Sequence, residues 1–323
     1  MNKIKIIALA IGLLGVQSCA AQSKKAPKIS SEEVSRVLKT LSADDMMGRS
    51  ALKPDEIKKS ADFISQEFKK AGLSYFNGLD SYMQNFETTR RGKTYPMFNV
   101  VGVLPGKSLK DEFVIFSAHY DHLGIIKKVV NQDSIANGAD DDASGTTAVI
   151  ELAKYFSKIG NNERTIIFVA FTAEEIGGFG SQYFSKQLNP DKVVAMFNIE
   201  MIGKESKFGK NNAFITGYER SDFGKILQKN LEGTAFKFYP DPYPTQNLFY
   251  RSDNATLARL GVAAHTISTS KMDSEPNYHK ASDHIETLDL DNMNEIIKAI
   301  ALSAQSIVAG KDTPTRVDTT QLK

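Results

Sequence analysis

The sequence has 323 residues, of which 41% are hydrophobic and 24% are charged, and its net charge is +2 at pH 7. This length fits one large domain or two small ones, and the composition is that of an ordinary globular protein. So small a net charge, without a run rich in lysine and arginine, argues against nucleic acid as a partner.

The N-terminal segment has the pattern of an export signal. Lys3 and Lys5 precede an apolar run from Ile6 to Val16, which is too short to span a bilayer. The only cysteine, Cys19, stands where such a signal would end. We therefore predict a signal peptide over residues 1–19.

The residues around this cysteine predict how the protein is held after export. Val16-Gln17-Ser18-Cys19 resembles a bacterial lipobox, whose cysteine is lipidated after cleavage. We expect a lipid anchor at Cys19 that holds the protein on the outer membrane, facing the periplasm. Cleavage after Ala21 would instead discard Cys19 and leave a periplasmic or secreted protein. In both cases the mature chain has no disulfide and no thiolate metal site.

Helical and strand patterns alternate along the rest of the chain. Residues 20–29 are polar and basic and are expected to form a tether. Apolar residues then repeat at helical spacing over residues 30–41 and 54–71, and Pro54 and Gly72 suit the two ends of the second helix. The predicted strands are Asn99–Leu104, Phe113–His119, Thr165–Thr172, Val193–Glu200, Ala213–Gly217 and Ala263–Thr269. Further helices are predicted at residues 145–158, 179–187, 221–231, 253–260 and 291–309.

The order of these elements predicts the fold class. The strands at residues 113–119 and 165–172 are almost continuously apolar, which is typical of central strands covered on both faces. We predict an α/β fold, a three-layer α/β/α sandwich around a mixed, mostly parallel sheet. Because no change in composition interrupts residues 30–310, we expect a single domain there, followed by a disordered polar tail over residues 311–323.

Polar residues follow several of the predicted strands. In open α/β sheets, sites form beyond the carboxyl ends of the strands. The motifs are His119-Tyr120-Asp121, Gly138-Ala139-Asp140-Asp141-Asp142-Ala143-Ser144-Gly145, Glu174-Glu175-Ile176-Gly177-Gly178, Asn198-Ile199-Glu200-Met201-Ile202-Gly203 and Tyr278-His279-Lys280-Ala281-Ser282-Asp283. Imidazole and carboxylate oxygen are the ligands of a hydrolytic metal pair. Three adjacent aspartates also repel one another unless a cation compensates them.

Each motif alone has an ordinary structural explanation. The acidic triplet Asp140-Asp141-Asp142 can cap a helix, and Glu174-Glu175 can begin one where the helix dipole favours negative charge. A lone histidine is more often structural than a ligand. We expect His122 either beside the ligands or in a loop hydrogen bond, His265 in the core and His284 at the surface. Taken together, these separate explanations do not account for the fact that every motif follows a predicted strand. A shared site does account for it.

In this order the motifs resemble the zinc aminopeptidases and carboxypeptidases of the M28 type. The resemblance runs from about Leu41 to the last helix and includes the segment Leu41–Arg49. It implies two zinc ions per chain that share Asp141. The implied ligands are His119, Asp141 and Glu200 for one zinc and Asp141, Glu175 and His279 for the other.

The resemblance also implies catalytic roles. Glu174 would be the general base, and Asp121 would be the partner of His119. The position of Glu200 is more often aspartate in the family, so the carboxylate here is displaced by about one bond length. Related chains often have histidine where this one has Asn254, but that position is not a metal ligand.

The implied reaction is hydrolysis of the peptide bond next to a free N-terminus. Glu174 would take a proton from the attacking water and pass it to the leaving amine. Carboxypeptidases and dipeptidases of the same family carry the same metal motifs. Glutaminyl cyclases share the fold with one zinc and part of the ligand set, and an inactive surface-tethered binding protein would lack a ligand or the base. The intact ligand set favours the peptidase.

A cluster of aromatic residues lies late in the chain, interleaved with prolines over residues 236–250. It can form a rigid loop packed on the domain. Since ligand pockets favour aromatic lining, it can also form a wall of the substrate pocket.

Overall fold

The computed structural model describes residues 28–130 and 132–322. The predicted signal peptide, Cys19 and most of the predicted tether lie outside these residues. Within the described ranges, no helix combines the length and apolar character needed to cross a membrane.

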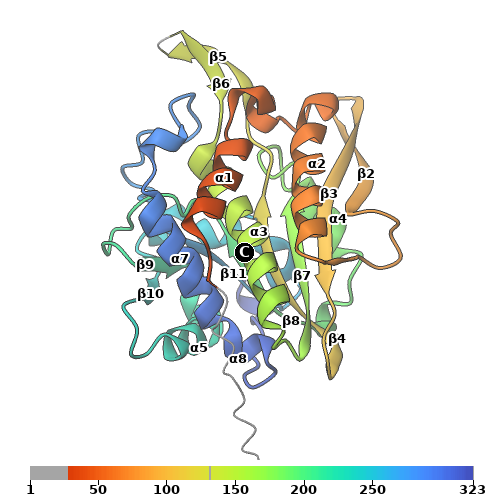
Figure 1. Ribbon diagram of the computed structural model, residues 1–323, viewed down its shortest axis with the longest axis vertical. Helices are drawn as coiled ribbons and strands as arrows, with labels where there is room; N and C mark the ends of the chain where they lie inside the picture. The colour runs from red at the N-terminus through yellow and green to blue at the C-terminus, as the bar shows by residue number, and fades with distance from the viewer. Residues whose placement is uncertain (1–27, 131, 323) are drawn as a thin grey trace, which may run out of the picture.

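A mixed sheet forms the middle layer of the molecule (Figure 1). Its strands follow the order β1-β3-β7-β4-β8-β11-β9-β10, with β2 also paired to β3. The central neighbours β7, β4, β8 and β11 are parallel, whereas β3 and β9 run antiparallel to β7 and β11. The strand bounds are β1 Ser74–Tyr75, β2 Met83–Arg90, β3 Lys93–Leu104, β4 Leu109–His119, β7 Arg164–Phe171, β8 Val193–Ile199, β9 Asn212–Ile215, β10 Lys237–Pro240 and β11 Ala263–Ser268. The predicted mixed, mostly parallel α/β fold is confirmed.

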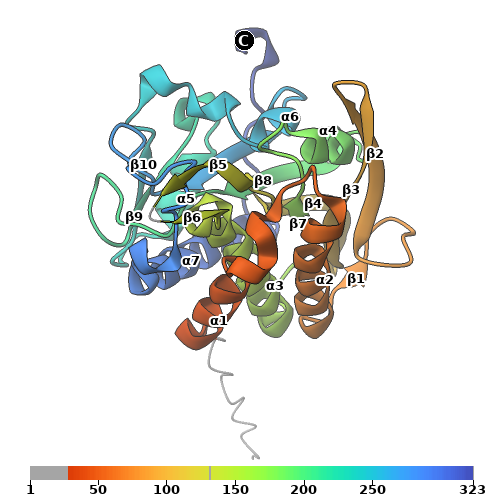
Figure 2. The ribbon, with the colours of Figure 1, turned by 90° about the horizontal axis from the view of Figure 1, so that it is seen from above.

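Helices cover both faces of this sheet (Figure 2). On one face lie α1, α2, α3 and α7, with α5 packed against α7, and on the other lie α4 and α6. The helix bounds are α1 Ser31–Leu41, α2 Pro54–Lys70, α3 Gly145–Ile159, α4 Phe179–Ser185, α5 Phe223–Asn230, α6 Asn254–Ala258, α7 Leu290–Ser303 and α8 Gln305–Val308. Side chains alternate along β4, so that Val114 and Phe116 belong to one apolar cluster and Ile115 to the other. Side chains of β4 therefore pack into the apolar clusters on both faces of the sheet.

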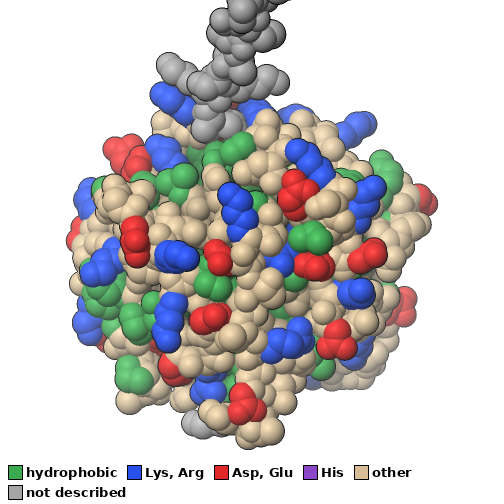
Figure 3. Space-filling model, turned by 90° about the horizontal axis from the view of Figure 1, so that it is seen from below, with side chains coloured by type: hydrophobic (Ala, Val, Ile, Leu, Met, Phe, Trp, Pro, Cys, Tyr) green, Lys and Arg blue, Asp and Glu red, His purple; other side chains and the backbone are tan. Residues whose placement is uncertain are grey.

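A hairpin of β5 Gly124–Val130 and β6 Asp133–Ala136 projects from one end of the molecule (Figure 1). It was not predicted, and neither were β2 and β10. At the opposite end of the molecule, acidic and basic side chains are interspersed over the surface (Figure 3). That distribution agrees with the small net charge.

The prediction of a disordered tail over residues 311–323 is wrong for its described part. Arg164 donates to the carbonyl oxygen of Asp312 at 2.7 Å, and the main-chain N–H of Val317 donates to Gly261 at 3.0 Å. Val317 is buried. Polar composition suggested a free segment, but partners distant in sequence satisfy its backbone and hold it along the domain.

Candidate active site

The predicted site residues come together at the carboxyl ends of three neighbouring strands. His119 ends β4, Glu200 directly follows β8, and Glu174 and Glu175 follow β7 after a short turn. Because β7, β4 and β8 are adjacent and parallel, their ends lie at one edge of the sheet. The sheet topology thus places these side chains over one small area.

Two groups of side chains in this area could each hold a metal ion. One consists of His119, Asp141 and Glu200, and the other of His122, Asp141 and Glu175, with the ligand atoms of each group within 4.8 Å of one another. Asp141 belongs to both groups, as a shared ligand must. Its two carboxylate oxygens face different imidazoles: Oδ1 lies 3.2 Å from Nε2 of His119, and Oδ2 lies 3.4 Å from Nε2 of His279.

The second group contains His122 where the prediction had His279, and His279 lies beside it. Nε2 of His279 lies 3.1 Å from Oε2 of Glu175, and Nδ1 of His122 lies 2.8 Å from Oε1 of the same carboxylate. All five predicted ligands therefore lie in one cluster, with His122 as an additional imidazole. The sequence left two alternatives for His122, and the structure places it beside the ligands.

Several atoms of this cluster are buried without a well-formed hydrogen bond. Among the described residues they include Nε2 of His119, Oδ2 of Asp141, Oε2 of Glu200 and Nε2 of His122. Buried polar atoms are normally paired, so several unpaired nitrogen and oxygen atoms on the residues of one cluster fit a bound cation. Imidazole and carboxylate are the ligands that zinc takes in hydrolytic sites. The residues present therefore fit a zinc site.

The electrostatics of the site also favour a cation. Burial raises the pKa of Glu200 to about 7, where the positive charge of His119 opposes the shift and the negative charge of Asp141 adds to it. Burial likewise raises the pKa of Asp121 to about 7. Asp141 behaves in the opposite way: burial would raise its pKa, but its hydrogen bonds to His119 and His279 hold the pKa well below the usual value. A bound cation would stabilise all of these carboxylates in their charged form.

The three adjacent aspartates have different roles. Only Asp141 faces the metal groups, whereas Oδ1 of Asp140 accepts from the main chain of Gly203 at 2.8 Å and Oδ1 of Asp142 accepts from Met201 at 3.1 Å. These two bonds tie the acidic loop to the segment that carries Glu200. The acidic triplet is therefore one candidate ligand between two residues that anchor the loop.

Asp283 anchors the same loop from the other side. Its carboxylate accepts from the main-chain N–H groups of Asp140 and Asp141, each at 3.0 Å. Since Asp283 follows His279 on the same loop, these bonds set the distance between His279 and Asp141. The sequence placed Asp283 in a motif without assigning it a role.

Glu174 lies among the charged groups of this cluster. Burial raises its pKa well above the usual value; the positive charge of His119 opposes this shift, and the negative charges of Glu200, Asp253 and Glu175 add to it. Its main-chain N–H donates to Oδ1 of Asp121 at 3.0 Å. The segment that carries His119 is thereby joined to the segment that carries Glu174.

Asp121 contacts His119 differently from the prediction. Nδ1 of His119 lies 3.0 Å from the main-chain oxygen of Asp121, whereas the carboxylate Oδ1 is 3.8 Å from that nitrogen. A carbonyl oxygen only accepts, so Nδ1 carries a proton, and Nε2 is the ring nitrogen left to bind a metal. The ring orientation therefore comes mainly from the backbone of Asp121, because its carboxylate is engaged by Glu174.

The backbone is strained beside the ligands. Ala173 before Glu174, Met201 after Glu200, and His279 itself have φ values of 61°, 51° and 57°. Such left-handed conformations are unfavourable for residues other than glycine and tend to occur at functional sites.

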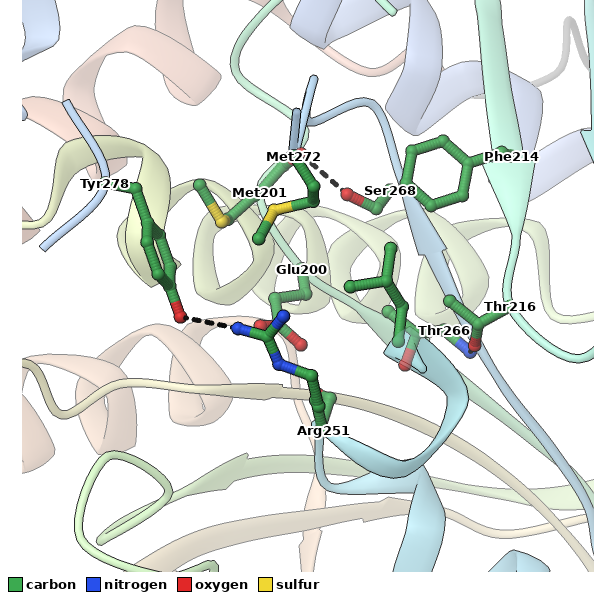
Figure 4. A pocket seen from close by; sticks show the side chains of 11 residues that line it. Glu200, Met201, Phe214, Thr216, Arg251, Thr266, Ser268, Met272 and Tyr278 are labelled. Atoms are coloured by element: carbon green, nitrogen blue, oxygen red, sulfur yellow. Dashed lines mark hydrogen bonds between the residues drawn. The ribbon is translucent and has the colours of Figure 1, made fainter. Parts of the chain in front are cut away.

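A cavity opens beside Glu200 (Figure 4). Its walls come from β9, β11 and the loops around them, and its lining residues are Glu200, Met201, Phe214, Thr216, Leu248, Arg251, Ser252, Thr266, Ser268, Met272 and Tyr278. Arg251 donates to the hydroxyl of Tyr278 at 3.4 Å, and the ring of Tyr278 stacks on His279 with the centroids 3.8 Å apart. The predicted aromatic cluster does not line this cavity; Tyr239 stacks on Phe208, for example. That cluster packs on the domain instead.

The family model for peptidase family M28 matches residues 99–304. This chain belongs to peptidase family M28. The predicted family is therefore confirmed, and the matched M28 region contains every proposed ligand and the proposed base.

Relatives and solved structures agree with this assignment. The chain is 29% identical over 254 residues to a probable leucine aminopeptidase of Trichophyton verrucosum, covering 74% of this chain and 64% of that protein. Its fold matches a zinc aminopeptidase from Bacillus subtilis, with a TM-score of 0.70 at 16% identity, covering 90% of this chain and 98% of that one. It also matches a Bacteroides thetaiotaomicron glutaminyl cyclase, with a TM-score of 0.65 at 16% identity, covering 87% and 99%. The chain spans about half to two thirds of the length of the curated relatives that it matches.

Proposed function

We propose that this M28 protein is a zinc-dependent exopeptidase that binds two zinc ions and removes N-terminal residues from peptides. The observation that carries the proposal is the pair of metal-ligand groups that share Asp141, with Glu174 beside them. The leucine aminopeptidase names of several relatives support the same activity.

Bound zinc, Glu174 and Glu200 would each have a different role in the reaction. Zinc held there supplies Lewis-acid chemistry, which acidifies water and polarises the carbonyl group of the scissile bond. Glu174 accepts a proton from the attacking water and delivers it to the leaving amine, because burial raises its pKa and so makes its carboxylate a stronger base. The carboxylates of Glu174 and Glu200 also favour the positively charged amine of a free N-terminus.

The cavity of Figure 4 is proposed to take the side chain of the first residue. Met201, Phe214, Leu248 and Met272 give this cavity an apolar part, which suits an apolar side chain.

Arg251 favours a second candidate, a dipeptidase or carboxypeptidase. Its side chain is exposed at the cavity, and among the described residues it makes no ion pair with a carboxylate. A guanidinium in this position could hold the free carboxylate of a short substrate. The two candidates therefore differ in which end of the peptide must be free.

One substrate panel tests these activities. The zinc-loaded protein is given the same tripeptide with free ends, with an acetylated N-terminus and with an amidated C-terminus. An aminopeptidase loses activity only on acetylation, whereas a carboxypeptidase loses it only on amidation. Formation of pyroglutamate from a glutamine-led peptide, without hydrolysis, would identify a cyclase. No turnover of any substrate with zinc bound would contradict the proposal.

We also propose that the protein is exported and held on the outer membrane, facing the periplasm, through lipidated Cys19. The support is the signal pattern and the lipobox-like segment that ends at Cys19. Anchoring would place the site among peptides outside the cytoplasm.

A further inference from the structure

The segment between α1 and α2 contains an arginine that is completely buried. Arg49 has a relative exposure of 0%, and it ends a turn in which Met47, Gly48 and Arg49 all have left-handed φ values, between 51° and 66°. A Cβ at Gly48 would lie 2.6 Å from the carbonyl oxygen of Ala136 and 2.8 Å from Gly124. The turn therefore packs against the base of the β5–β6 hairpin, where Gly124 and Ala136 pair.

The guanidinium group of Arg49 joins the two segments that carry metal ligands. Its Nε donates to the carbonyl oxygen of Tyr120 at 2.7 Å, and its Nη2 donates to that of Gly138 at 2.9 Å. Tyr120 directly follows the ligand His119, and Gly138 opens the loop that contains Asp141. Nη1 completes the set with bonds of 2.6 Å to the carbonyl oxygens of Leu41 and Asn137.

The main chain of Arg49 contacts a third position of the site. The N–H of His122 donates to the carbonyl oxygen of Arg49 at 3.0 Å. Side chain and backbone of one residue thus hold the segments of His119, His122 and Asp141 at fixed positions relative to one another.

The charge of Arg49 is not neutralised by direct contact. All of its side-chain hydrogen bonds go to carbonyl oxygens, and within the described chain it forms no ion pair. Burial lowers its pKa, while the negative charges of Asp283, Asp121, Asp141 and Asp142 act on it in the opposite direction. An arginine is nevertheless always protonated in proteins. It therefore adds a permanent positive charge beneath a group of buried carboxylates that repel one another.

We propose that Arg49 is a positioning residue of the metal centre, one that sets zinc affinity by fixing the ligand segments and by balancing their negative charge. The proposal rests on the proposed function only in that the site binds zinc. Lysine could supply the charge but not the planar fork, which here reaches four carbonyl oxygens at once. The segment Leu41–Arg49 thereby helps to position the ligand segments, although it lies far from the ligands in the sequence.

The test compares Arg49→Met and Arg49→Lys with a matched control, Arg164→Met. Arg164 is also buried, and it also donates to main-chain carbonyl oxygens, those of Ile307 and Asp312, but it contacts none of the ligand segments. For each full-length variant, the zinc dissociation constant is measured by competition with a chelator. The melting temperature is measured with and without zinc.

We expect Arg49→Met to weaken zinc binding about 10–100-fold, as changes around metal ligands typically do, and Arg49→Lys to recover part of the loss. Arg164→Met is expected to lower the melting temperature of the metal-free protein while zinc binding stays at the wild-type level. The rise in melting temperature on adding zinc should shrink only in the Arg49 variants, because that rise depends on zinc affinity.

Other outcomes would overturn the proposal. If Arg49→Met lowers the melting temperature but binds zinc as tightly as the wild type, Arg49 serves stability alone. If neither Arg49 variant folds in excess zinc while Arg164→Met does, Arg49 is a folding residue. If only Arg49→Met fails to fold, the zinc affinity of Arg49→Lys is compared with that of the wild type. A weaker affinity supports the proposal, and an unchanged affinity overturns it. A wild-type protein that binds no zinc would instead contradict the proposed function.

Discussion

Nδ1 of His122 lies 2.8 Å from Oε1 of Glu175, so an imidazole outside the predicted ligand set contacts one of the predicted ligands. The same nitrogen lies 3.8 Å from Oδ2 of Asp141, so it is the ring atom that faces the metal group. A carboxylate only accepts, so Nδ1 donates to Glu175 when it carries a proton. His122 therefore orients Glu175 through this hydrogen bond or, after losing the proton, binds the metal through Nδ1.

Replacing His122 should weaken zinc binding in either role. We expect His122→Gln to raise the zinc dissociation constant about 10–100-fold, because groups that orient metal ligands typically contribute that much. His284→Gln is the matched control, since His284 pairs with Asp133 on the hairpin instead. Equal zinc affinities for the two variants would show that His122 has no part in the metal site.

Glu174→Gln should retain zinc and lose most of its turnover. The amide keeps the size of the side chain but cannot accept the proton, and the loss of a general base typically costs 10²–10⁴-fold in rate. Metal content and kcat are measured on the same preparation. Loss of zinc from this variant would make Glu174 a ligand and reverse its assignment with Glu175.

Glu200→Ala should lose one zinc and keep the other. The backbone of Glu200 is fixed at the end of β8, where its N–H donates to Ile267 at 3.1 Å, and Oε2 is buried without a partner among the described residues. Zinc–oxygen bonds are about 2.0–2.2 Å long, so Glu200→Asp would reach the metal imperfectly and should keep only part of the activity. If Glu200→Ala keeps two tightly bound zinc ions and near-normal turnover, Glu200 is not a ligand.

The metal-free protein should lose stability as the pH rises from about 5 to about 7.5. The folded state raises the pKa of Glu200, Asp121 and Asp140 to about 7, mainly through burial. In this window the folded state therefore binds more protons than the unfolded state, and the free energy of unfolding falls with pH. His265, whose pKa burial lowers to about 4, opposes the trend only up to the usual histidine value.

Melting temperatures across this range, with chelator and with zinc, measure the effect. Zinc should reverse the slope, because deprotonated ligands bind it better. A metal-free protein that becomes more stable between pH 5 and 7.5 would show that the site carboxylates do not control stability.

Cys19→Ser should release the protein from the membrane fraction or leave its precursor unprocessed. Stable anchoring generally takes more than one acyl chain, and all of them depend on this cysteine. Fractionation of cells and the mass of the mature N-terminus give the result. A soluble wild-type protein that begins at Gln22 would contradict the lipid anchor.

The sequence alone determined the fold class and indicated which residue types make up the candidate site. The apolar run of β4 and its neighbours sets a buried parallel sheet, because only covered central strands are apolar on both faces. The ligand types also follow from the sequence, since a histidine or an acidic residue directly after such a strand must lie at the sheet edge. That position singles out His119, the pair Glu174-Glu175 and Glu200 as candidates, and the resemblance to the M28 family implied the role of each.

Contacts between distant segments were decided only by the tertiary structure. Whether Asp140, Asp141 or Asp142 faces the metal depends on which carboxylates bind the main chain of Gly203 and Met201, residues about sixty positions away. The burial of Arg49 likewise depends on carbonyl oxygens of Tyr120 and Gly138 that come together only when the sheet and the hairpin are formed. Local sequence sets the chemistry that a residue offers, but packing sets its partner, and the partner determines its role.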